Sequence, residues 1–143
     1  MATVKNSITI DAPVEKVFEY VKQPENLPEF WPSMLEVSNI KELPTGGYRF
    51  EWVYKMAGMR FKGASEVTEF IPNERTVTHT SGGIESTITW EYSPLESGTK
   101  VNITGEYKVP LPLVGKLAES FIVKQNEQES QVILANLKAR MEA

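Results

Sequence analysis

Histidine occurs once in this chain, at position 79, and it limits the chemistry that the side chains could perform. Any Ser-His-Asp mechanism, and any metal site built on histidine, would have to use His79. The chain contains no cysteine, so no thiolate could complete a metal site beside that imidazole. The sequence therefore predicts no metal site and indicates no cofactor. His79 is either a general base or hydrogen-bond partner for a ligand, or an ordinary sheet histidine at a pocket edge.

Polar side chains interrupt a regular pattern near the C-terminal end. Residues 115–143 contain no proline, and no glycine after the first residue, which predicts one long helix. Steps of three and four residues place one seam on a single face of this helix: Leu117, Phe121, Gln125, Gln128, Val132, Ala135 and Ala139. A buried, unpaired amide or carboxylate costs about 1–3 kcal/mol. We therefore expect Gln125, Gln128 and the adjacent Glu129 to line a wet cavity, unless the helix turns Glu129 into solvent.

Aromatic residues gather on one face of the predicted strands. Four of them alternate with polar residues within a single strand: Tyr48, Phe50, Trp52 and Tyr54. Trp90, Tyr92 and Tyr107 follow the same alternation on two later strands. One interpretation is the wall of a pocket for a flat or apolar ligand, with phenol hydroxyls as hydrogen-bonding groups. The other interpretation is ordinary packing of the core.

The elements that must position these residues can be read in chain order. Residues 3–10 alternate like a half-buried strand, and Pro13 begins a helix that carries Val14, Val17, Phe18 and Val21. A second short helix holds Leu27, Phe30 and Trp31. Six further strands are predicted at residues 35–43, 48–56, 60–71, 76–81, 84–92 and 101–109. A seven-stranded antiparallel sheet with one apolar face needs a cover. Only the C-terminal helix is long enough, at about 40 Å for roughly 27 residues.

Two other apolar groups each allow two interpretations. Leu111, Leu113 and Val114 lie in a proline-bounded loop and form either the rim of a pocket or a contact across the sheet edge. A second stripe on the long helix comprises Val123, Leu134, Leu137 and Met141. This stripe either packs between the sheet and the two short helices or joins two copies of the chain. The sequence thus predicts a monomer or a weak homodimer.

Length and charge narrow the classes of protein to which the chain can belong. Its 143 residues fit a single domain spanning positions 1–143. The net charge is −4 and no basic cluster occurs, which argues against a nucleic-acid partner. No apolar run approaches the roughly 18–20 residues of a membrane helix, so no integral membrane segment is predicted. The first residues lack the pattern of a signal peptide, and we therefore expect a cytoplasmic protein.

Several motifs together resemble one known superfamily. Residues 10–32 read IDAPVEKVFEYVKQPENLPEFWP, in which a strand runs through Ala-Pro into a helix and then to Trp-Pro. The turn at Pro72, the GTKV of residues 98–101 and the long terminal helix also match. This combination is similar to the START-like helix-grip (SRPBCC) superfamily. The resemblance implies an α+β fold, with a curved seven-stranded antiparallel sheet around the C-terminal helix and two short helices after the first strand.

The resemblance implies several functions, because the superfamily includes lipid carriers, polyketide aromatase/cyclases, quinone-binding proteins and chaperone-activating domains. We expect binding or carriage of a hydrophobic small molecule between sheet and helix. The predicted ligand-binding residues are Phe50, Trp52, Tyr54, His79, Trp90, Tyr107, Leu113, Phe121, Gln125 and Glu129. One alternative is an enzyme of the cyclase/dehydratase type, with His79, Glu129 and a tyrosine as its acid and base. Another is a protein-interaction module without a deep pocket.

Overall fold

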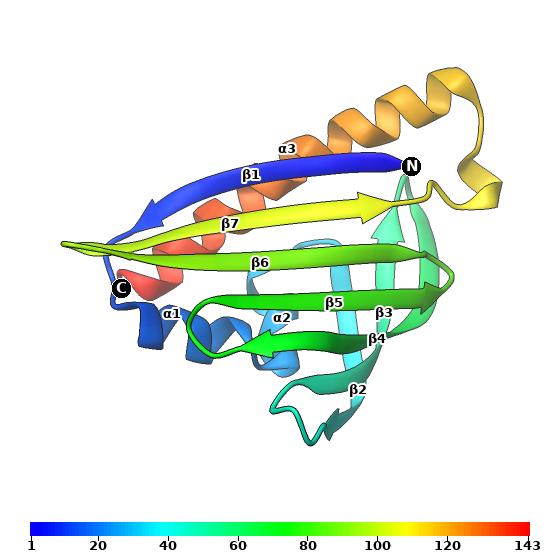
Figure 1. Cartoon of the computed structure of the whole chain (residues 1–143). Helices are drawn as coiled ribbons and strands as arrows, with labels where there is room; N and C mark the ends of the chain where they lie inside the picture. The colour runs from blue at the N-terminus through cyan, green and yellow to red at the C-terminus, as the bar shows by residue number, and fades with distance from the viewer.

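A computed structural model shows seven strands in one curved sheet, with a long helix running along its inner face (Figure 1). It describes the backbone of residues 1–143 and every side chain except those of Leu111, Lys116 and Leu117. The elements are β1 (Ala2–Ile10), α1 (Val14–Val21), η1 (Pro24–Asn26), α2 (Leu27–Phe30), β2 (Met34–Glu42), β3 (Tyr48–Met56), β4 (Met59–Ile71), β5 (Arg75–Gly82), β6 (Ser86–Leu95), β7 (Gly98–Tyr107), η2 (Leu111–Leu113) and α3 (Lys116–Met141). This is the α+β helix-grip architecture that the sequence predicts.

The sheet is antiparallel throughout, in the order β1-β7-β6-β5-β4-β3-β2. Side chains alternate between the two faces along each strand, and residues that lie directly opposite each other on paired strands share a face. Phe50 lies opposite Ser65, and Trp90 lies opposite both Thr76 and Ile103. These five residues are buried, which identifies the inner face. The predicted aromatic row therefore does turn inward.

Two short helical segments close one end of the sheet, as expected. Helix α1 buries all four of its apolar positions, Val14, Val17, Phe18 and Val21. Proline limits the next segment, because Pro24 begins η1, Pro28 occupies the first turn of α2 and Pro32 follows its end. Leu27 and Phe30 of α2 are buried against the sheet and α3. Ring centroids of Phe30 and Trp90 lie 6.2 Å apart in an edge-to-face arrangement.

The face of α3 that packs inward is not the seam predicted from the sequence. Phe121 and Val132 of that seam are 60% and 47% exposed, and Gln125, Gln128, Ala135 and Ala139 are exposed as well. Leu117 lies outside the described side chains. The buried face is instead formed by Ile122, Ser130, Ile133, Leu134, Leu137 and Met141. The helix is thus rotated by about one residue, or 100°, because its larger aliphatic side chains bury more apolar surface than Val132 and the alanines would.

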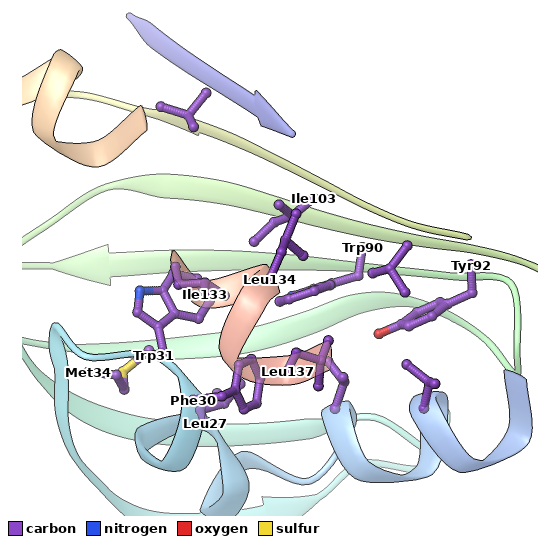
Figure 2. Packing of buried hydrophobic residues seen from close by; sticks show 14 of the residues in the cluster. Leu27, Phe30, Trp31, Met34, Trp90, Tyr92, Ile103, Ile133, Leu134 and Leu137 are labelled. Carbon is purple, nitrogen blue, oxygen red and sulfur yellow. The ribbon is translucent and has the colours of Figure 1, made fainter. Parts of the chain in front are cut away.

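The second apolar stripe provides the anchor of α3, as one of its two interpretations proposed. Figure 2 shows Leu134 and Leu137 between the strands and the short helices, beside Phe30 and Trp90. Val123 is half-buried, and Leu134, Leu137 and Met141 are buried within the chain itself. These residues are therefore not available to join two copies, which removes the alternative in which the stripe forms a dimer interface.

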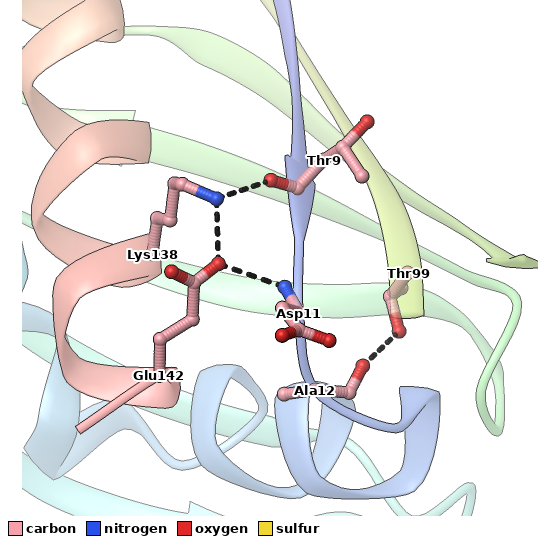
Figure 3. Close-up of polar contacts among 6 residues, drawn as sticks. All are labelled: Thr9, Asp11, Ala12, Thr99, Lys138 and Glu142. Carbon is pink, nitrogen blue, oxygen red and sulfur yellow. Dashed lines mark hydrogen bonds and ion pairs between the residues drawn. The ribbon is translucent and has the colours of Figure 1, made fainter. Parts of the chain in front are cut away.

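Polar contacts fasten the end of α3 to the turn that follows β1 (Figure 3). The Glu142 carboxylate accepts from the backbone N–H of Asp11 at 2.8 Å and from Lys138 Nζ at 2.5 Å. Lys138 Nζ also donates to the carbonyl oxygen of Thr9 at 3.0 Å. The hydrogen bond from Asp11, and then the one from Lys138, lower the pKa of Glu142 below its usual value. The end of α3 is thus fixed to the end of β1.

A fully buried hydrogen bond joins this turn to β7. Thr99 is 0% exposed, and its hydroxyl donates to the carbonyl oxygen of Ala12 at 2.8 Å. Thr99→Val keeps the shape of the side chain but leaves that carbonyl without its partner. We expect the free energy of unfolding to fall by about 1–3 kcal/mol. Urea denaturation measures this loss, and Thr3→Val at an exposed position of β1 is the control, expected within about 0.5 kcal/mol of wild type. Equal effects of the two substitutions would contradict the prediction.

Candidate functional site

A cavity lies between the inner face of the sheet and α3. Its volume is about 110 Å³. Strands β1 and β3–β7 supply most of its wall, α3 covers it, and Trp31 and Met34 close one side. The lining is mainly apolar and comprises Val4, Trp31, Met34, Trp52, Tyr54, Met56, Ser65, Thr80, Ile84, Ser86, Ile88, Ile103, Gly105, Tyr107, Asn126, Glu129, Ser130 and Ile133. We call it the first cavity.

A second cavity of about 70 Å³ adjoins the first and extends toward α1 and α2. The two share the lining residues Trp31, Met34, Ser65, Thr80 and Ile88, which therefore form the partition between them. Phe50 and Trp90 line the second cavity only. All three tryptophans of the chain consequently border one cavity or both. Binding of a ligand in either cavity should therefore change the tryptophan fluorescence.

One carboxylate faces the first cavity, and a single residue holds it in place. Glu129 of α3 is half-buried. Its Oε2 accepts from the hydroxyl of Ser33 at 2.5 Å, and its Oε1 accepts from the backbone N–H of Ser33 at 3.3 Å. Ser33 lies between α2 and β2, so this contact joins the covering helix to the segment that closes the cavity. The carboxylate is thereby oriented before any ligand arrives.

Two tyrosines, Tyr54 and Tyr107, line the same cavity as this carboxylate. Trp31 Nε1 donates to the Tyr54 hydroxyl at 3.1 Å, and Asn126 Nδ2 donates to the Tyr107 hydroxyl at 2.9 Å. Burial raises the pKa of Tyr54 above its ordinary value, and the negative charge of Glu129 raises it further. Burial also raises the pKa of Tyr107. Both phenols therefore remain protonated at neutral pH and can act as hydrogen-bond donors.

The indole of Trp52 carries a buried donor with no acceptor among the described residues. Trp52 is 5% exposed and lines the first cavity, yet its Nε1 has no hydrogen-bond partner in the described part of the protein. A buried N–H left unpaired costs about 1–3 kcal/mol, and most such groups in folded proteins are paired. The polar groups that line the first cavity are therefore only partly satisfied by the protein itself.

The predicted site residues separate into three groups. Trp52, Tyr54, Tyr107 and Glu129 line the first cavity, and Phe50 and Trp90 line the second. Leu113 is half-buried and packs against the core but lines neither cavity, while Leu111 lies outside the described side chains. The other three, His79, Phe121 and Gln125, are exposed and line neither cavity.

His79 points away from the inner face, which corrects its prediction as a pocket residue. It pairs with Thr87 and Glu66 on the neighbouring strands, and its Nδ1 lies 3.1 Å from the Thr87 hydroxyl. The adjacent Thr78 and Thr80 line the cavities instead, because successive side chains on a strand point to opposite faces of the sheet. Phe121 and Gln125 are wrong for a different reason, namely the rotation of α3 described above. Asn126 and Glu129 take the inward positions on that helix.

Several lining residues were not predicted from the sequence. Ser65, Thr80, Ser86 and Ser130 are small polar residues within apolar elements, and parity on the strands could have identified the first three. Ser33 had no such signal, because it follows Pro32 in a link without periodicity. Within the part of the chain whose side chains are described, no group of three or more His, Cys, Asp or Glu residues could hold a metal ion. Likewise, no described helix is long and apolar enough to cross a membrane.

Three solved structures are similar to the chain over nearly its whole length. Protein TTHA0849 from Thermus thermophilus is 22% identical, with a TM-score of 0.84 over 97% of this chain and 96% of that one. A START superfamily protein from Mycobacterium smegmatis is 16% identical, with a TM-score of 0.82 over 99% and 98% of the two chains. The Zhui aromatase/cyclase from a Streptomyces species is 15% identical, with a TM-score of 0.76 over 99% and 96%. At these identities the similarity shows a common fold.

The sequence itself supports a family assignment. No curated protein sequence matches the chain significantly. The family model for polyketide cyclase / dehydrase and lipid transport matches residues 1–142, which is almost the entire chain. The helix-grip topology and the START superfamily neighbour agree with that match. The chain therefore belongs to the polyketide cyclase / dehydrase and lipid transport family.

Proposed function

We propose that the chain binds a hydrophobic small molecule in the first cavity and carries it without chemical change. The observation behind this proposal is the mainly apolar lining between sheet and helix, which also includes polar residues such as Glu129 and Tyr54. A concave, mostly apolar site with a few placed polar groups is typical of small-molecule binding. Transfer of apolar ligand surface from water supplies about 25 cal/mol per Å² before the entropic cost of binding.

The size of the cavity indicates the size of the group that it takes. An apolar cavity of about 150 Å³ is large enough for a benzene ring. The first cavity, at about 110 Å³, and the adjoining second one, at about 70 Å³, together reach that range. Met34 forms part of the partition, and its flexible side chain can adjust to an occupant. We therefore propose that one six-membered ring enters first and that any longer ligand displaces the partition.

A cyclase or dehydratase activity is the second candidate function, and one observation favours it. Glu129 and Tyr54 line the same cavity, and a carboxylate beside a protonated phenol is a plausible pair of base and acid. His79 does not belong to this pair, because its imidazole lies on the outer face. An enzyme of this type would thus have to operate with Glu129 and Tyr54. The cavity also makes a protein-interaction module without a pocket the weaker interpretation.

We also propose that the chain acts as a monomer or a weak homodimer. Its large apolar stripe on α3 is buried internally. Exposed apolar side chains on the same helix are spaced apart, at Phe121 and Val132, and offer little area for a stable interface. Sedimentation velocity over a range of concentrations would test this proposal, and a concentration-independent dimer would contradict it.

Ethylbenzene is a suitable probe of the proposed binding, because it is neutral, apolar and of the size described. We expect a saturable change in tryptophan emission and an increase in Tm on titration, since a ligand that binds only the folded state stabilises it. Ser65→Leu is expected to weaken binding at least about tenfold. Ser65 is buried and lines both cavities, so the larger side chain would occupy the space of the ligand.

The matched control is Ser7→Leu, which makes the same exchange at an exposed position of β1. This variant should bind ethylbenzene like the wild type. If the wild type showed no saturable response, or if Ser65→Leu and Ser7→Leu bound equally well, the cavity would not be the binding site and the proposal would fail.

A further inference from the structure

One residue supplies all the charge on the walls of the first cavity. Among the described residues that line it, Glu129 alone is charged, and no lysine, arginine or histidine accompanies it. Lys22 borders the second cavity only, and its Nζ forms an ion pair with Glu19 at 3.0 Å. The first cavity therefore presents a negative potential to any occupant, and no opposite charge on its described walls offsets that potential.

The Glu129 carboxylate still has acceptor capacity after its contacts with Ser33. A carboxylate offers about four lone-pair positions, and the two hydrogen bonds from Ser33 use two of them. The remaining positions can accept from a donor on the ligand. A neutral hydroxyl satisfies this requirement with a charge-assisted hydrogen bond, which is stronger than a bond between neutral groups. An ether of the same size has no proton to donate.

An anionic ligand meets the opposite situation. A carboxylate in the first cavity would exchange most of its hydration for a few protein donors, among them Trp52, Tyr54 and Tyr107. It would also share the cavity with the negative charge of Glu129, which disfavours a second anion. An ammonium group would be attracted to Glu129, but it would also lose its hydration, with a single carboxylate to compensate for three donors. A neutral hydroxyl avoids both penalties.

We propose that the ligand is a neutral hydroxyl-bearing compound, a phenol or an alcohol, whose hydroxyl donates a hydrogen bond to Glu129 while its apolar body fills the first cavity. This inference rests on the function proposed above and names the ligand class of the same site. It assigns to Glu129 the role of a specificity residue that selects against carboxylates such as fatty acids.

Three ligands of nearly equal size test the inference: 4-ethylphenol, 4-ethylanisole and 4-ethylbenzoate. At pH 7 the phenol is neutral and the benzoate is ionised, by their ordinary pKa ranges. Isothermal titration calorimetry is expected to show that the phenol binds about tenfold more tightly than the anisole, the effect of one hydrogen bond to a charged acceptor. The benzoate is expected to bind at least about tenfold more weakly than the phenol.

Substitutions then connect this selectivity to Glu129. In Glu129→Gln the charge is lost, and the preference for phenol over benzoate should fall at least about tenfold. Ser33→Ala removes the hydroxyl that donates to Glu129 but leaves the negative charge of Glu129 in place. This variant should therefore still prefer the phenol over the benzoate, even if its stability falls. Glu106→Gln removes one negative charge from an exposed position of β7 and should leave all three affinities unchanged.

The outcomes separate this inference from the proposed function. If ethylbenzene and all three ligands fail to bind, the proposed function itself is wrong. If they bind, but the anisole or the benzoate equals the phenol, only the ligand class is wrong. The role of Glu129 would be overturned if Ser33→Ala abolished the preference as completely as Glu129→Gln, since loss of local structure rather than of charge would then explain both results.

Discussion

Leu137→Ala is expected to lower the free energy of unfolding by about 2–5 kcal/mol, one of the largest effects of a single substitution in this chain. Leu137 is 0% exposed and belongs to the face of α3 that is buried against the core. Removing three carbons there takes away buried apolar surface and leaves a space between the sheet and the short helices. The neighbouring Phe30 and Trp90 are large and edge-packed, so the space would close only in part.

Val132→Ala is the matched comparison, because it shortens an apolar side chain on the same helix at a position of the predicted seam. Val132 is exposed, and we expect its replacement to change stability by no more than about 0.5 kcal/mol. Chemical denaturation of both variants measures the difference. A larger loss from Val132→Ala than from Leu137→Ala would mean that the helix packs through the predicted seam after all.

The rotation of α3 shows where sequence periodicity stops being informative. Steps of three and four residues occur on every face of a helix, so periodicity alone does not select one face. In α3 the faces differ little in apolar content, because Phe121 and Val132 lie on one side and Ile122 and Ile133 lie one residue further along. The contacts with the sheet decide between them, and those contacts connect residues that are far apart in the chain.

The sheet was more predictable, because a strand offers only two faces. Alternation placed Trp52, Tyr54 and Tyr107 on the inner face, and all three line the first cavity. It could not say which face a polar strand such as β5 turns inward, and His79 was therefore assigned to the wrong side. In β5 the apolar Val77 shares the outward face of His79, whereas the inward positions are the threonines Thr76, Thr78 and Thr80.

The polar residues that α3 contributes to the cavity were predictable only in part. A polar interruption in the middle of the inward helix face was expected, and Asn126, Glu129 and Ser130 do line the cavity there. The expected Gln125 is exposed, in consequence of the rotation. The partner of Glu129 could not be foreseen, since Ser33 lies 96 positions earlier in the chain and meets it only through the fold.

Gly63→Ala is the second substitution with a large expected effect, because it changes the wall of the first cavity. Gly63 of β4 lies opposite Trp52 of β3. A Cβ atom at position 63 would lie 2.4 Å from Trp52 Cζ2 and 2.3 Å from the carbonyl oxygen of Ser81. Both distances are shorter than any normal contact, and the second one involves backbone. We expect a loss of about 3 kcal/mol, the upper part of the range for overpacking.

The clash also predicts a specific change in the cavity. Trp52 would have to move its indole off β4, so its emission should shift toward the red and ethylbenzene should bind more weakly. Gly105→Ala is the control for stability, since the added Cβ would meet only Ile88 Cδ1, at an ordinary 3.4 Å. Without a positive φ at Gly105, this exchange should be neutral or should stabilise by about 0.4–1 kcal/mol. Only Gly63→Ala is therefore expected to destabilise the protein, and equal stabilities of the two variants would mean that Trp52 does not rest on Gly63.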